Sequence, residues 1–131
     1  MSSHHDVIVV GIGSMGAAAC LHLAKRGASV LGIDSQPVPN TNSSYNGNTR
    51  VIRLTYQEHP DYVPLLKEAY RLWDEIEQET DTRLLHKTGV LYMGFPDGEA
   101  ISGVKLASEK HDLRYSTLTH KELAQQFPQF T

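Results

Sequence analysis

Three glycines and one acid near the start of the chain have the types and spacing of a nucleotide-binding site. Gly11, Gly13 and Gly16 form a G-x-G-x-x-G run directly after the apolar residues 7–10, and Asp34 stands 18 residues beyond Gly16. Glycines at these places permit a tight turn, close approach of the backbone to a pyrophosphate, and close packing of a helix on a strand. An acid about 20 residues farther on can bond a ribose hydroxyl. The pattern predicts a dinucleotide site; the alternative is a strand–helix turn whose glycines serve packing alone.

The elements around this run must hold it at the end of a strand. Residues 6–10 predict a fully buried strand, residues 15–26 a helix that stops at Gly27, and residues 29–33 a second strand. Two strands joined through a helix lie parallel, so together they predict a βαβ unit. A carboxylate at Asp34 suits a free ribose hydroxyl and repels a 2′-phosphate, which disfavours NADP and leaves FAD or NAD.

The remaining segments predict further helices and strands, so the fold class we expect is α/β. In chain order they are a long polar loop (35–49), a helix (59–80), a strand (88–95), a helix (98–111), a short strand (115–119) and a helix (120–127).

Composition excludes several functional classes. The 131 residues carry a net charge of -3 with scattered Lys and Arg, which argues against a nucleic-acid surface. Val7–Val10 is the longest apolar run near the N-terminus, far short of the ~20 residues that span a bilayer. The single cysteine, Cys20, excludes an internal disulfide framework, and the seven histidines lack metal-ligand spacing. We expect a soluble, cytoplasmic protein with no metal, nucleic-acid or membrane partner.

Four segments of the chain carry a family resemblance in their order and spacing. They are DVIVVGIGSMGAAACLHLAKRGASVLGID, SSYNGNTRVIRLTY, YVPLLKEAYRLWDEIEQET and KTGVLYMG. Together they resemble the FAD-dependent amino acid oxidases of the D-amino acid oxidase superfamily, in the branch of monomeric sarcosine oxidase and N-methyl-tryptophan oxidase. The second segment, a serine-rich loop ending in G-x-T-R-x-x-R, is the most specific. The resemblance implies FAD and a Rossmann-like FAD-binding βαβ unit, followed by the start of a mixed-sheet substrate domain, with the division at 1–85 and 86–131.

The resemblance also implies roles for individual residues. Arg50 would lie against the flavin ring, and Arg53 would bind the substrate's carboxylate, for which a guanidinium fork is well shaped. The alternative for this pair is two solvated arginines on a helical turn. The implied cofactor-binding residues are Gly11, Ile12, Gly13, Ser14, Met15, Gly16, Asp34, Ser35, Gln36, Ser43, Ser44, Thr49 and Arg50.

The activity implied is oxidation of a secondary (N-methyl) amino acid to an imine, with oxygen as acceptor and hydrogen peroxide as product. Tyr45 and Asn46 replace a histidine pair of sarcosine oxidases, and Asn48 replaces an aspartate, which leaves a larger N-methyl or cyclic amino acid open. Two alternatives are a flavin- or NAD-linked dehydrogenase and a non-catalytic or truncated dinucleotide-binding module. Family members are longer, so we expect this chain to be inactive alone and to have the remainder of its own enzyme, as a second chain, for a partner.

Overall fold

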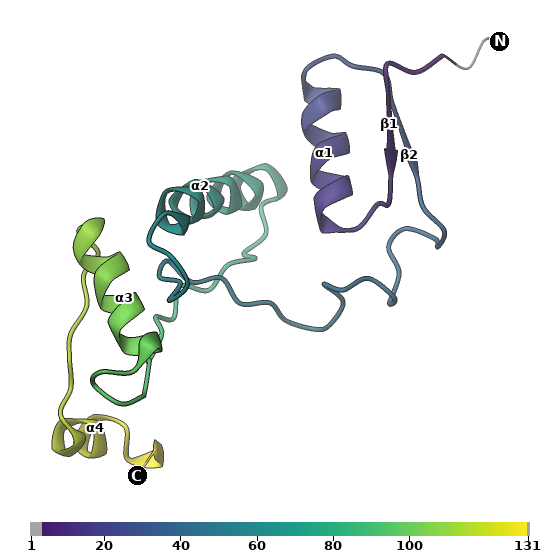
Figure 1. Ribbon diagram of the computed structural model, residues 1–131. Coiled ribbons are helices and arrows are strands. Elements are labelled where there is room, and N and C mark those ends of the chain that lie inside the picture. Colours follow the sequence, from purple (N-terminus) through teal and green to yellow (C-terminus); the bar gives the residue numbers. More distant parts are fainter. Residues whose placement is uncertain (1–3, 131) are drawn as a thin grey trace. The chain divides into compact units, whose positions relative to one another are not determined.

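The structure is a computed structural model that describes residues 4–130, and its contacts divide the chain between Val51 and Ile52 into two compact units. The first unit holds β1, α1 and β2, and the second holds α2, α3, α4 and a short 3-10 helix (Figure 1). No helix within the described range has the length and apolarity needed to cross a membrane.

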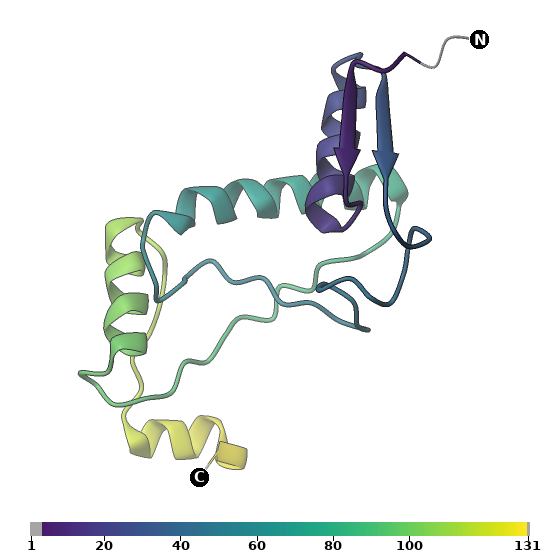
Figure 2. The same ribbon diagram turned by 45° about the vertical axis from the view of Figure 1, so that its right-hand side comes forward.

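The first unit is the βαβ arrangement that the sequence predicts. Strand β1 (Val7–Val10) leads into helix α1 (Ser14–Lys25), which returns to strand β2 (Val30–Ile33). The two strands pair in parallel, beginning with Val7 opposite Val30. Figure 2 shows both arrows pointing the same way with α1 beside them. The carboxyl ends of both strands therefore lie at one edge, together with the glycine run that follows β1.

The strands are less buried than the sequence predicts. Ile8 is 57% exposed, Val10 82% and Ile33 45%, whereas Val7 and Val9 are half-buried. Alternate side chains of a strand point to opposite faces, and Val9 lies on the face beside Gly16 of α1. Within the described residues only this one face is covered by a helix, so the expectation of a fully buried strand was wrong for the other face.

The second unit contains the helices that the sequence predicts, with slightly different ends. They are α2 (Tyr62–Thr80), α3 (Glu99–Lys110) and α4 (His120–Gln126). The 3-10 helix η1 (Pro128–Phe130) follows them and was not predicted. Helix α4 begins with a capping box: the Thr119 hydroxyl accepts from the Glu122 amide, and the Glu122 carboxylate accepts from the Thr119 amide.

The two strands expected at 88–95 and 115–119 do not form. β1 and β2 are the strands of residues 4–130, and neither later segment pairs with another. A strand exists only when its backbone groups bond a neighbour, and the described chain offers these segments no partner. The mixed sheet is therefore not seen here, while the division into cofactor and substrate domains at residue 85 stays a prediction.

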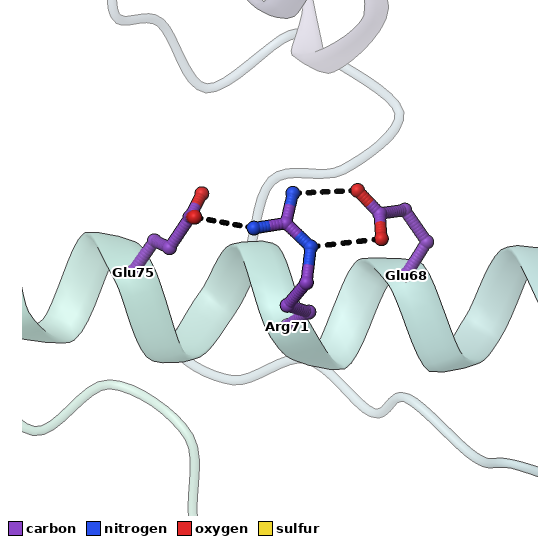
Figure 3. Close-up of polar contacts among 3 residues, drawn as sticks. All are labelled: Glu68, Arg71 and Glu75. Atoms are coloured by element: carbon purple, nitrogen blue, oxygen red, sulfur yellow. Dashed lines mark hydrogen bonds and ion pairs between the residues drawn. The ribbon is translucent and has the colours of Figure 1, made fainter.

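Helix α2 carries a row of ion pairs on its exposed face. Arg71 donates two hydrogen bonds to Glu68 and a third to Glu75, as Figure 3 shows. The spacing of three and four residues places these side chains side by side on the helix. Because all three side chains are exposed, water screens these pairs and they add little to stability. The stability of this unit must therefore come mainly from its core.

The core of the second unit is small and depends on close packing. Val63 of α2 and Ala107 of α3 are fully buried, with Ser108 and Thr55 nearly so. Helix α3 approaches the segment before α2 so closely that a Cβ added at Gly103 would lie 2.2 Å from the carbonyl oxygen of Gln57. Glycine at this place allows the contact.

The substitution Gly103→Ala tests this packing against helix propensity. Alanine is about 1 kcal/mol better than glycine inside a helix, so propensity alone predicts stabilisation. We expect instead a net loss of about 1–3 kcal/mol in the free energy of unfolding, because the methyl group meets backbone. Urea denaturation measures it, with the exposed neighbour Ser102→Ala as control. A more stable Gly103→Ala protein would show that α3 does not lie this close.

Candidate functional site

The three glycines of the run each meet a different geometric requirement. Gly11 has φ +91°, a left-handed conformation that glycine adopts without strain. A Cβ on Gly13 would meet nothing closer than a ring carbon of Tyr45 at 3.9 Å, so the loop faces open space there. A Cβ on Gly16 would lie 1.8 Å from the carbonyl oxygen of Gly11. A dinucleotide-binding loop has the same three requirements: a tight backbone turn, close approach of the backbone to the pyrophosphate, and close packing of the helix on the strand.

Asp34 bonds the glycine run itself. Its Oδ2 accepts from the Ile12 amide at 2.6 Å, and its Oδ1 accepts from the Gln36 amide at 3.0 Å. These backbone donors, Ile12 first, hold the pKa of Asp34 below its ordinary value of 3.8, since they favour the charged form. Each carboxylate oxygen keeps a further lone pair, so the same group can still accept from a ribose hydroxyl.

The start of α1 is left open toward the loop. Its N-cap is Gly13, which has no side chain to bond the first amides, and the first turn carries no acid. Amides at a helix N-terminus without partners, together with the positive end of the helix dipole, attract phosphate groups. The residues present therefore fit the pyrophosphate of a dinucleotide.

A pocket of about 410 Å³ lies over this loop. Ten of the predicted cofactor-binding residues line it, while Ile12, Thr49 and Arg50 do not. The residues that line it are Gly11, Gly13, Ser14, Met15, Gly16, Asp34, Ser35, Gln36, Asn40, Asn42, Ser43, Ser44 and Tyr45. None of them is Lys or Arg, so amides and hydroxyls must supply the contacts to an anion. Ile12 contributes through the amide bonded to Asp34 instead.

Asn40 and Asn42 are pocket residues that the sequence analysis did not single out, and Tyr45 is one that it did not assign to the cofactor. Asn40 organises the polar loop, because its Oδ1 accepts from the Asn42 amide at 2.9 Å and from the Ser43 hydroxyl at 3.1 Å. The Asn42 side chain then donates to Gln36 at 3.3 Å. The many asparagines in residues 35–49 could have indicated this role, because short polar side chains bond the nearby backbone in turns.

Arg50 lies at the end of the first unit and is exposed. Its Nη1 donates to the Thr49 carbonyl at 2.6 Å, and its guanidinium carbon lies 5.7 Å from the ring centroid of Tyr45. Gly47, with φ +142°, makes room for it, because a Cβ there would lie 2.8 Å from the same Nη1. This loop therefore holds a cation beside a wall of the pocket.

Arg53 belongs to the second unit, in a segment without regular secondary structure. The helical turn of the alternative interpretation is therefore absent. Its guanidinium carbon lies 4.5 Å from the ring centroid of Tyr56. Partial burial alone would lower the pKa of Arg53, but contacts with the phenols of Tyr92 and Tyr56 raise it above its ordinary value. Among the residues described, no carboxylate pairs with Arg53. A charged guanidinium without an anion can accept one from a ligand.

The chain is similar to known flavin enzymes over its whole length. A profile of the FAD dependent oxidoreductase family matches residues 6–131. The chain is 44% identical over 133 residues to the monomeric sarcosine oxidase of Bacillus sp. (strain B-0618), covering 100% of this chain and 34% of that protein. It is 35% identical over 127 residues to the N-methyl-L-tryptophan oxidase of Yersinia pestis (strain Pestoides F), covering 97% of this chain and 34% of that protein.

The chain is also similar to a solved structure of an amino acid oxidase. The chain matches an open form of a mutant of NikD, described as an unusual amino acid oxidase essential for nikkomycin biosynthesis, with a TM-score of 0.71 and 30% identity. The match covers 92% of this chain and 32% of that one. The chain therefore spans about a third of the length of these relatives.

Asp34→Asn tests whether the carboxylate holds the glycine run. An amide offers one acceptor to two backbone donors, so we expect the protection of the Ile12 amide against hydrogen exchange to fall several-fold at pH 7. Because the folded pKa is lowered, the contribution of the carboxylate is complete above the ordinary value of 3.8 and is lost as pH falls through the lower folded value. The difference between wild type and variant should therefore shrink below pH 3.8. Exchange followed by NMR measures this.

The exposed Asp97→Asn in the second unit serves as the control for charge removal. An Ile12 amide equally protected in Asp34→Asn and in wild type at pH 7 would contradict the assigned bond.

Proposed function

The chain belongs to the FAD-dependent oxidoreductase family, and we propose that it serves the oxidation of a secondary, N-methyl amino acid by FAD and oxygen. The observation that carries the cofactor part is the pocket over Gly11, Gly13 and Gly16, because these glycines provide the tight turn, the open approach and the close helix packing of a dinucleotide-binding loop. The activity is a proposal for the whole protein, because the chain spans about a third of its relatives.

The first unit would hold the ADP part of FAD. The amides that open α1 would bond the pyrophosphate, and Asp34 would accept from the adenosine ribose through the lone pairs that Ile12 and Gln36 leave free. Ser43 and Ser44 line the same pocket and would add hydroxyl donors. Thr49 and Arg50 would follow the cofactor toward its flavin ring.

The two arginines would have different roles, Arg53 toward the substrate and Arg50 toward the flavin ring. Bound FAD supplies an acceptor for a hydride from the carbon beside the substrate nitrogen and returns the two electrons to oxygen. Arg53 would bind the substrate's carboxylate and so orient that carbon, because its charge is unpaired in the described chain. Arg50 would place a fixed positive charge against the flavin ring, which favours the reduced, electron-rich form.

The names of the relatives suggest the substrate class, and two loop residues of this chain, Tyr45 and Asn46, bear on the size of the substrate. The named relatives act on sarcosine and on N-methyl-L-tryptophan. The family resemblance implies that Tyr45 and Asn46 replace a histidine pair of sarcosine oxidases, and Tyr45 lines the pocket of the first unit. We therefore propose an N-methyl or cyclic amino acid larger than sarcosine as the preferred substrate.

Arg53→Lys and Arg50→Ala, made in the protein from its complete coding sequence, separate the two roles. Lysine loses the paired contact of a guanidinium with a carboxylate, so kcat/KM should fall about 10- to 100-fold while FAD affinity stays unchanged. Arg50→Ala should slow both reduction and reoxidation of the flavin. Stopped-flow absorbance and peroxide release from N-methyl amino acids measure these effects.

Two results would contradict the proposal. Equal effects of both substitutions on FAD loading alone would mean that neither arginine acts as assigned. The second result is native protein that retains NAD and shows no flavin absorbance between the near-ultraviolet and the blue. It would contradict the oxidase proposal and favour an NAD-linked dehydrogenase.

A further inference from the structure

The backbone that carries Arg53 is fixed by side chains instead of by secondary structure. Residues 52–56 lie in neither a helix nor a strand, so their carbonyls lack ladder partners. The Tyr70 hydroxyl donates to the Ile52 carbonyl at 3.2 Å, and the Tyr92 hydroxyl donates to the Thr55 carbonyl at 2.6 Å. These two bonds flank Arg53 on both sides.

The two phenols come from different parts of the second unit. Tyr70 lies on α2, and Tyr92 lies in the extended segment that follows it, 37 residues from Thr55. Both bonds are partly shielded from water, and Thr55 is only 8% exposed. The Thr55 hydroxyl also donates to the Tyr92 oxygen at 3.4 Å. Shielded bonds from two separate elements restrict the segment more than exposed bonds within it would.

A third tyrosine restricts the side chain itself. The ring of Tyr56 lies 4.5 Å from the guanidinium carbon of Arg53, within the range of a cation–π contact. Tyrosines hold the arginine without neutralising it, whereas an aspartate or glutamate would satisfy its charge and compete with an incoming anion. The described chain provides no such carboxylate to Arg53.

We propose that Tyr70 and Tyr92 are positioning residues that fix the Arg53 backbone, and that Tyr56 aims its guanidinium at the carboxylate of the substrate. This inference rests on the proposed function, since it assigns the anion to an amino acid. Fixing the cation before binding removes an ordering cost that a mobile arginine would pay with every substrate.

The test compares an N-methyl amino acid with its carboxamide, in the FAD-loaded protein from the complete coding sequence. Tyr70→Phe and Tyr92→Phe remove one hydroxyl each and keep the ring. Each should raise the KM for the acid about two- to tenfold, the range of one lost hydrogen bond. KM for the carboxamide, kcat and FAD affinity should change less than twofold. The control is Tyr115→Phe, whose hydroxyl bonds the exposed Glu109; it should match wild type.

A second measurement does not depend on activity. The order parameter of the Arg53 Nε–H group, measured by NMR relaxation, should fall in Tyr70→Phe, Tyr92→Phe and Tyr56→Leu but not in Tyr115→Phe. An Arg53 side chain as ordered in all three variants as in wild type would overturn the positioning roles.

The kinetic outcomes separate this inference from the proposed function. A wild-type protein that prefers the acid, with both phenylalanine variants unchanged, overturns the role of the two hydroxyls and leaves the proposed function standing. A wild-type protein that does not prefer the acid overturns Arg53 as a carboxylate site, and the proposed function fails with it.

Discussion

The bond from the Ile12 amide to the Asp34 carboxylate joins the end of β2 to the turn that follows β1, and the cofactor pocket depends on it. At 2.6 Å it is short, and it fixes the loop between Gly11 and Gly16 relative to the acid that would meet the ribose. One carboxylate thus serves two purposes: it shapes the phosphate loop and forms part of the pocket wall. Because both backbone donors lower its pKa, the group is charged at any pH near neutrality.

The first unit relies on such bonds because it has little core. No residue that the structure describes before Val51 is fully buried, and one face of the sheet presents Ile8, Val10 and Ile33 to solvent. Hydrophobic burial is ordinarily the main stabilising term in a domain. Here the loop geometry comes from glycine conformations, the Asp34 carboxylate and the side-chain bonds of Asn40. The site residues are therefore held by hydrogen bonds inside the first unit, between residues at most 22 positions apart.

The sequence predicted the elements that local pattern determines. The βαβ unit, the glycine run, Asp34 and four helices follow from apolar spacing and from the few residues that permit sharp turns. It did not predict that Asp34 would bond Ile12, or that Tyr70 and Tyr92 would bond the carbonyls beside Arg53, because these contacts join residues 18 to 37 positions apart. The segments 88–95 and 115–119 are rich in residues that favour strands, but a strand forms only beside a pairing partner, and the local sequence does not say whether one is present.

The central claim is that the glycine run and Asp34 bind the ADP part of FAD. A titration of the ¹⁵N-labelled chain with FAD, ADP and riboflavin, followed through its amide NMR signals, tests it most directly. We predict that FAD and ADP both shift the amides of residues 11–16 and of Gln36, because both carry the pyrophosphate and ribose. Riboflavin, which has neither, should leave these signals in place. Shifts of residues 11–16 with riboflavin but none with ADP would contradict the claim.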